Sequence, residues 1–252
     1  MFLLPNSKGI YIIVFLWKFR SIMNGKLDLN CSSCSMKSHL FDFLNKEELD
    51  RISLCKKRVV FKTGEIIVKQ GTPVSHVISF TSGIAKVYIE GANNRNLILQ
   101  FIKPTQFLGS PGIYVDSIHH FTVVAIEDSS VCFIDLDVFK NIVRTNADFA
   151  DAFIRQLSRE GIFNYARFIS LTHKNMHGRI ADGLLYLHKT IFNDRNFEIR
   201  ISRQDLAEMT GMSKDSVIRT LKELDEDGVI KLNQRSILIV DLKKLDRICE
   251  LG

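Results

Sequence analysis

The chain has 252 residues, of which 46% are hydrophobic and 25% charged, an ordinary composition for a globular protein with room for two modest domains. Its formal net charge of +6 suits a nucleic-acid-binding protein without establishing one. Five cysteines, an odd number in which only Cys31 and Cys34 are closely spaced, are unlike a secreted disulfide framework, so we expect a reducing cytoplasm.

The amino-terminal segment contains one apolar run, from Ile10 to Trp17. Its eight residues are far fewer than the roughly 20 that a membrane-spanning helix needs, so we predict no membrane anchor. Lys18 and Arg20 follow the run without a small-residue cleavage pattern, which disfavours a signal peptide. We expect residues 1–22 to be translated upstream sequence, with Met23 as the working start; a membrane tether through residues 1–22 is the alternative.

The segment from Arg58 to Asp135 consists of short β-prone runs separated by turn residues. Gly64, Gly71 and Gly83 stand between runs, where tight turns need a residue that takes positive φ. The spacing predicts one compact barrel or sandwich of strands. The runs are VVFK, EIIVK, HVISF, IAKVYI, NLILQFI, FTVVAI and SVCFID.

Two helices are expected next, a short one from Asp137 to Thr145 and one of about 24 residues that begins at Asp148. The longer helix carries an apolar stripe wider than one neighbour would cover, which suits the seam of a two-fold dimer. Its members are Ala150, Ile154, Leu157, Gly161, Tyr165 and Phe168, with Phe149, Phe153, Ile162, Ala166 and Ile169 beside them. The following helix is expected to turn Ile180, Leu184, Leu187 and Ile191 inward.

The run from Ser202 to Gly228 predicts two short helices joined by a tight turn. Ser202 and Asp205, three places apart, form a capping-box pattern before an apolar stretch. Gly211 suits the turn because it takes positive φ without steric cost, and Ser213 is a good cap for the second helix. The pattern is typical of a helix-turn-helix.

The second of these helices has one apolar and one polar face. The apolar face contains Val217, Leu221 and Leu224, and the polar face contains Lys214, Asp215, Arg219 and Lys222. An acid and an arginine four residues apart can contact base edges. Two β-prone runs, Val229 to Leu232 and Ser236 to Val240, then predict a wing. The alternative is an ordinary helical hairpin in which Asp215 and Arg219 form only an ion pair.

This carboxy-terminal run resembles the DNA-binding end of the CRP/FNR superfamily of bacterial transcription regulators, which carries an acid and an arginine at the positions of Asp215 and Arg219. The strand-rich half, through FKTGEIIVKQGTPVSHVISFTSGIAKVYIEG and KPTQFLGS, resembles the double-stranded β-roll sensor of the same superfamily. The resemblance implies an α+β fold with a cyclic-nucleotide-binding-domain-like β-roll, a long dimerisation helix and a winged helix-turn-helix. The expected parts are an extension over 1–30, the β-roll over 31–147, the dimerisation helix over 148–172 and the DNA-binding domain over 173–252.

The resemblance also implies a cytoplasmic homodimer that binds near-palindromic double-stranded DNA, contacts RNA polymerase and is not an enzyme. The residues expected at the DNA are Ser202, Arg203, Ser213, Lys214, Asp215, Ser216, Ile218, Arg219, Lys222 and Arg235. Lys214 and Ile218 depart from common family residues, so the operator sequence does not carry over. The competing interpretation is a ligand-binding or enzymatic β-barrel protein with an interaction module at its end, although no convergent nucleophile and base is evident.

The expected effector pocket includes Gly109, Ser110, His119 and His120. Cyclic-nucleotide-binding relatives have a glutamate just after the glycine that matches Gly109, and an arginine and a serine where His119 and His120 stand. A cyclic phosphate and a ribose hydroxyl call for a guanidinium and a carboxylate. Cyclic AMP is therefore not the expected ligand. Adjacent histidines point in opposite directions on a strand, so we expect His119 and His120 to be surface or rim residues.

The cysteines resemble part of an iron-sulfur site. Oxygen-sensing members of the superfamily bind a cluster through an amino-terminal cysteine group and one β-roll cysteine, which CSSCSMKSHLF and Cys132 resemble. Leu40 stands where a third amino-terminal cysteine is expected, and Cys55 is a candidate substitute. The implied ligand set is Cys31, Cys34, Cys55 and Cys132. The alternative is that Cys31 and Cys34 are a relic or a redox pair, and that the other two are small buried apolar residues.

Overall fold

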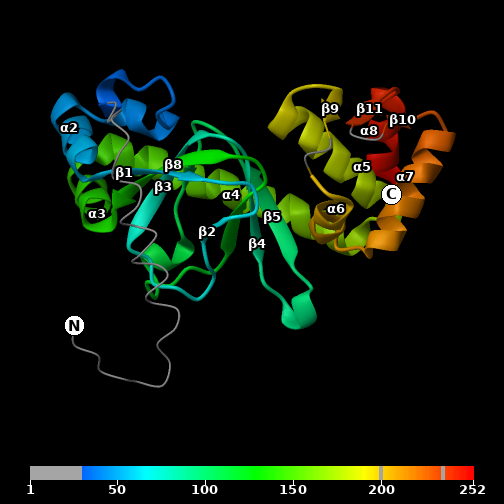
Figure 1. Cartoon of the computed structure of the whole chain (residues 1–252), viewed down its shortest axis with the longest axis horizontal. Coiled ribbons are helices and arrows are strands. Elements are labelled where there is room, and N and C mark those ends of the chain that lie inside the picture. Colours follow the sequence, from blue (N-terminus) through cyan, green and yellow to red (C-terminus); the bar gives the residue numbers. More distant parts are fainter. Residues whose placement is uncertain (1–29, 199–200, 234–235) are drawn as a thin grey trace.

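The computed structural model describes residues 30–198, 201–233 and 236–252 (Figure 1). The predictions for residues 1–22 and for Arg235 lie outside these ranges. Within them, no helix is both long enough and apolar enough to cross a membrane.

A helical segment precedes the strands. It consists of two 3-10 turns, η1 (Cys31–Ser33) and η2 (His39–Phe43), and helix α2 (Lys46–Cys55). Asn45 caps α2 in a reciprocal capping box with Glu48, whose side chain accepts a hydrogen bond from the Asn45 backbone. Leu40 and Phe41 are buried, so η2 packs into the core beside α4 rather than standing apart.

The strands form two four-stranded sheets that face each other as a β-roll, which confirms the predicted runs. One sheet has the order β1-β8-β3-β6 and the other β2-β7-β4-β5. Phe80, Val123 and Val131, all fully buried, belong to the apolar layer between them. The bounds are β1 (Lys57–Phe61), β2 (Ile66–Val68), β3 (His76–Ser82), β4 (Ala85–Ile89), β5 (Leu97–Ile102), β6 (Phe107–Leu108), β7 (Thr122–Ala125) and β8 (Ser129–Asp135), with 3-10 turns η3 (Ala92–Asn94) and η4 (Pro111–Ile113).

Two helices follow the β-roll, α3 (Leu136–Thr145) and α4 (Ala147–His173), as predicted. An aromatic cluster fixes the first half of α4 to the β-roll. Phe139 lies with its ring centroid 5.4 Å from Phe107, 5.9 Å from Phe149 and 5.2 Å from Phe153. Because Phe107 comes from β6, this cluster joins the sheet, α3 and α4 in one core.

The carboxy-terminal domain is a helix-turn-helix with a small wing. Its sheet has the order β10-β11-β9, so β9 adds a third strand to the two that the sequence predicts. Ile180, Leu184, Leu187 and Ile191 are buried, as expected. The bounds are α5 (Met176–Tyr186), the π-helical segment η5 (Leu187–Phe192), β9 (Asn196–Glu198), α6 (Arg203–Thr210), α7 (Lys214–Glu226), β10 (Ile230–Leu232), β11 (Ser236–Ile239) and α8 (Leu242–Leu251).

The two halves of the chain share a core. Figure 1 shows α4 running from the β-roll to the carboxy-terminal domain, with α6 close to β5. Ile84, Ile98 and Phe101 of the β-roll belong to the same apolar cluster as the buried residues of the carboxy-terminal domain. The Phe101 backbone N–H donates to the Tyr186 hydroxyl at 3.0 Å, and burial raises the pKa of Tyr186 to about 12.

Candidate nucleic-acid interface

The turn between α6 and α7 has the geometry that the sequence predicts. The Ser202 hydroxyl accepts a hydrogen bond from the Asp205 backbone N–H at 3.0 Å, and Asp205 Oδ2 accepts one from the Ser202 N–H at 2.9 Å. Gly211 ends α6 with φ +61°, a conformation that a side chain would strain. The Ser213 hydroxyl accepts from the Ser216 N–H at 3.1 Å and caps α7.

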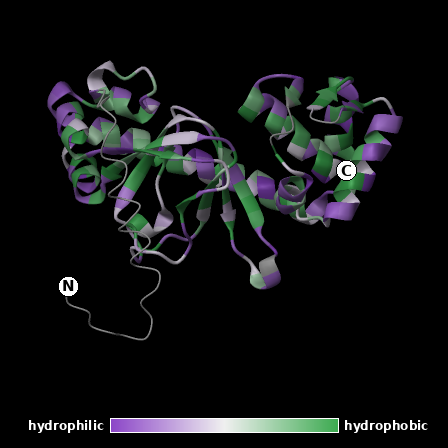
Figure 2. Cartoon of the chain, in the orientation of Figure 1, coloured by the Kyte–Doolittle hydropathy of each residue, from purple (hydrophilic) through white to green (hydrophobic). Residues whose placement is uncertain are grey.

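Helix α7 presents its polar residues outward. Val217, Leu221 and Leu224 are at most 1% exposed and pack into the core. Figure 2 shows hydrophilic residues along α7, which lies at the edge of the domain. The outward side chains are Lys214, Asp215, Ile218, Arg219 and Lys222, all exposed, and we call them the reading face. The major groove of DNA is wide enough to admit an α-helix, so a face of this kind can contact base edges.

The amino-terminal end of α6 contains two more of the residues expected at the DNA. Ser202 is exposed, whereas Arg203 is half-buried and its Nη1 has no hydrogen-bond partner in the part of the chain that the structure describes. Burial lowers the pKa of Arg203. This Nη1 is itself enclosed by protein, so the feature here that suits a phosphate oxygen is the dipole of α6, which favours an anion at the helix amino terminus.

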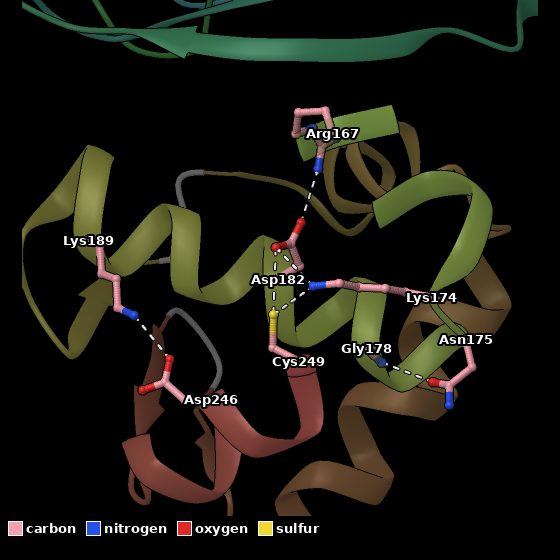
Figure 3. Close-up of polar contacts among 8 residues, drawn as sticks. All are labelled: Arg167, Lys174, Asn175, Gly178, Asp182, Lys189, Asp246 and Cys249. Carbon is pink, nitrogen blue, oxygen red and sulfur yellow. Dashed lines mark hydrogen bonds and ion pairs between the residues drawn. The ribbon is translucent and has the colours of Figure 1, made fainter. Parts of the chain in front are cut away.

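A polar cluster connects α4, α5 and α8 where the long helix enters the carboxy-terminal domain (Figure 3). Lys174 donates to Cys249 Sγ at 2.9 Å and to Asp182 Oδ1 at 3.4 Å. Arg167 Nη1 lies 3.7 Å from Asp182 Oδ2, and Arg167 also donates to the Met209 carbonyl of α6. The sequence did not indicate this cluster, because its members come from distant positions and match no motif.

The expected effector residues lie near η4, with one correction. His119 is not a surface residue: it is 8% exposed, its Nδ1 has no hydrogen-bond partner among the described residues, and burial, followed by the charge of His120, lowers its pKa. His120 is exposed and lies 2.9 Å from Asp116 Oδ2. The prediction failed for His119 because this residue lies just before β7 and pairs with another segment of the chain. Its backbone N–H donates to the Thr72 carbonyl, and its carbonyl accepts from the Gly71 N–H.

The surroundings of Gly109 and Ser110 are apolar. A Cβ added at Gly109 would meet Ile113, Phe107 and Phe153 side chains at 3.5 to 3.7 Å. Ser110 is buried, and its hydroxyl lies 3.4 Å from the Ile118 carbonyl. Neither of these residues, nor either histidine, supplies the guanidinium or carboxylate that a cyclic nucleotide needs.

Three cysteines face one small cavity of about 30 Å³, enough for one water-sized molecule. Cys31, Cys34 and Cys132 line it together with Lys37, Lys56 and Arg58, and we call this the thiol pocket. Burial raises the pKa of Cys132 to about 11.

Cys55, the proposed fourth ligand, is placed differently. It does not line the thiol pocket, and its Sγ lies 3.4 Å from the Ile52 carbonyl. Among the described residues, no group of three or more Cys, His, Asp or Glu side chains is arranged to hold a metal ion. The iron-sulfur site stays a prediction.

The fold and the reading face define a winged helix-turn-helix DNA-binding protein joined to a β-roll by a long helix. Residues 178–248 match the model of the Crp-like helix-turn-helix domain, and residues 58–146 match that of the cyclic nucleotide-binding domain. The chain belongs to the CRP/FNR family of DNA-binding transcription regulators, a family of regulators and not of enzymes.

Proteins that are similar in sequence or in fold align with most of the chain. The transcriptional regulatory protein btr of Bordetella pertussis is 26% identical over 87% of this chain and 93% of its own length. Electron transport regulator A of Shewanella oneidensis is 25% identical over 86% and 89%. The structure of FixK2 from Bradyrhizobium japonicum has a similar fold, with a TM-score of 0.70 and 19% identity over 77% of this chain and 96% of that one.

Proposed function

We propose that this regulator works as a cytoplasmic homodimer that reads a near-palindromic operator in double-stranded DNA and contacts RNA polymerase. The exposed reading face of α7, held on buried Val217, Leu221 and Leu224, is the observation that carries the proposal. Two such faces in successive major grooves lie about 34 Å apart in dimeric helix-turn-helix proteins.

The roles at the DNA follow from side-chain chemistry. The Arg219 guanidinium donates two hydrogen bonds to a guanine, and Asp215 accepts one from a cytosine amino group. Ile218, 45% exposed, offers an apolar contact to a thymine methyl group. Phosphate contacts that fix the register fall to the remaining members of the interface, Ser202, Arg203, Ser213, Lys214, Ser216, Lys222 and Arg235.

An exposed apolar stripe on α4 supports a dimer. Large apolar side chains stand exposed along one face of this helix, where no other part of the described chain covers them. They are Ile154, Leu157, Ile162, Tyr165, Phe168 and Ile169, between 43% and 67% exposed. Such a stripe on a long helix suits a two-fold helix pair.

The signal that we propose is redox in nature, oxygen or nitric oxide, and not a cyclic nucleotide. The thiol pocket supports this, because it gathers three cysteines, and thiols are side chains that oxidants and nitric oxide modify. The name of Electron transport regulator A, a relative, points the same way. The apolar surroundings of Gly109 argue against a cyclic phosphate.

A base-reading test separates this function from an ordinary helical hairpin. Operator fragments are selected from a random pool with the wild-type protein, and Arg219→Ala and Lys222→Ala are compared on them. Losing the guanine contact should cost about 1–3 kcal/mol and relax preference at one base pair, whereas losing Lys222 should weaken binding to all sequences alike. Unchanged operator affinity of Arg219→Ala would contradict the assignment.

The signal is tested separately by measuring operator occupancy under nitrogen, air and nitric oxide. Iron analysis and a visible spectrum of protein purified and reconstituted anaerobically decide whether a cluster is present. Colourless, iron-free protein would exclude the cluster. Occupancy that is equal under all three gases would exclude the redox signal.

A further inference from the structure

A lysine of the β-roll forms ion pairs with the first helix of the helix-turn-helix, and we call these pairs the Lys86 contact. Lys86, on β4, places its Nζ 2.5 Å from Asp205 Oδ1 and 3.7 Å from Glu208 Oε2, both on α6. The three side chains are 19%, 10% and 9% exposed, so water screens the contact poorly. The ring of Tyr88 lies 5.4 Å from the same Nζ.

The contact sits in the core that the two halves of the chain share. Ile84, Ile98 and Phe101 of the β-roll pack into the apolar cluster of the carboxy-terminal domain. At its edge Lys103 donates to the Thr190 carbonyl. Lys86 is therefore a charged group within a packed interface, and α6 has little freedom to shift while the ion pairs remain.

Asp205 connects the Lys86 contact to the amino-terminal end of α6, where we propose phosphate contacts. Its Oδ1 accepts from Lys86, while its Oδ2 accepts from the Ser202 backbone N–H at 2.9 Å and from the Ser202 hydroxyl at 2.6 Å. One carboxylate thus fixes the helix cap and the distance of α6 from β4 together. Ser202 and its neighbour Arg203 are residues that we assign to phosphate contacts.

The balance of charge between α6 and β4 depends on Lys86. One ammonium faces two carboxylates, and Glu208 Oε2 has no hydrogen-bond partner in the described part of the chain. Without the lysine, Asp205 and Glu208 would stand close together as buried carboxylates with no cation beside them. Because such charges must be solvated or separated, α6 would move away from the β-roll.

The Lys86 contact does not cover the reading face of α7. Asp215 and Arg219 are exposed while α6 packs against β5 and pairs with Lys86 of β4. The contact therefore does not cover the surface that reads DNA. It determines how that surface is oriented relative to the β-roll and to α4.

We propose that Lys86 is a positioning residue for DNA binding, which acts from the β-roll through Asp205 and Glu208 to hold the helix-turn-helix in a binding-competent orientation. The inference rests on the proposed operator binding. If losing the lysine leaves the competent orientation populated only about one tenth of the time, apparent operator affinity falls about tenfold. Arginine, which keeps the charge and the reach, should preserve it.

The test uses the full-length protein and the operator selected with wild type. Lys86→Met is expected to bind at least about tenfold more weakly, and Lys86→Arg within about threefold of wild type. Lys69→Met is the matched control, because Lys69 also belongs to the β-roll and pairs at 2.5 Å with a carboxylate, Glu90, but in a more exposed ion pair that includes no residue of α6. It should bind as wild type does.

A second substitution tests the stated cause. Glu208→Gln removes the surplus negative charge, so adding it to Lys86→Met should recover at least about half of the lost binding free energy. That recovery distinguishes positioning by charge from general damage, and the double variant keeps the test valid if Lys86→Met folds poorly. Lys86→Met binding as tightly as wild type, Lys86→Arg failing to preserve affinity, or no recovery in the double variant would each overturn the inference. A wild type that selects no operator would instead reject the proposed function.

Discussion

The exposed stripe on α4 gives a quantitative prediction for the dimer. Ile162 is 67% exposed in the single chain. Full burial of an isoleucine side chain contributes about 1.5–3 kcal/mol, so covering the exposed two thirds contributes about 1–2 kcal/mol per copy. A two-fold seam contains the residue twice, about 2–4 kcal/mol per dimer. Since about 1.4 kcal/mol is a factor of ten, Ile162→Ser should raise the dimer dissociation constant about 30- to 1,000-fold.

Leu54→Ser is the matched control for this prediction. Leu54 is 89% exposed on helix α2, so the substitution removes a comparable apolar side chain from a helix that takes no part in the seam. Analytical ultracentrifugation over a range of concentrations measures the dissociation constant, and circular dichroism checks that both variants fold. The reasoning is refuted if Ile162→Ser and Leu54→Ser dimerise equally well, or if both weaken the dimer to the same extent.

Two further predictions follow from titratable groups. Burial raises the pKa of Glu160, only partly offset by the hydrogen bond from Gln156, so the native protein holds this proton more tightly than the unfolded chain, and stability falls as pH rises through the raised value. Glu160→Gln still accepts that hydrogen bond and should be more stable than wild type at pH 7 and equally stable below about pH 4, as measured by urea denaturation; an equal effect at both pH values would contradict the cause. Because burial raises the pKa of Cys132 from 9.0 to about 11, iodoacetamide should alkylate it about 100-fold more slowly at pH 7.5 than an ordinary thiol, as followed by peptide mass spectrometry. A rate equal to that of free cysteine would show that the thiol pocket opens readily.

The helix-turn-helix was predictable because its determinants are local. Ser202 and Asp205 close a capping box within one turn, and Gly211 needs positive φ at a position that the sequence marks. Val217 and Leu221 recur at helical spacing and are buried on the expected face. Nothing outside this segment is needed to derive these features.

Two of the missed elements, both short strands, lack such local signals. Strand β6 has only Phe107 and Leu108, and β9 only Asn196 to Glu198, which are too short to show alternation. Both exist because a neighbouring strand supplies their hydrogen bonds, β3 for β6 and β11 for β9. Their positions are properties of the assembled sheets.

The burial of His119 shows the same limit at a candidate site. Strand alternation predicts only that His119 and His120 differ in direction, and one of them is buried while the other is exposed. It does not say which one the fold encloses, because the backbone pairing of His119 with Gly71 and Thr72 joins positions about 50 residues apart. Lys86 is a stronger case, since its partners on α6 lie 119 residues or more away.

The shared core constrains how a signal at the thiol pocket would reach the DNA. Cys31 belongs to the same buried cluster as Phe149 and Phe153 of α4, and Phe41, which lines the pocket, lies with its ring 6.1 Å from Phe107. A change of packing there acts first on the start of α4. That helix has 27 residues, about 40 Å, and it reaches α5 and α6 through Arg167. Because Lys86 ties α6 to the β-roll at the same time, the helix-turn-helix is held from two directions, and a shift of α4 changes its orientation only by straining or breaking the Lys86 contact.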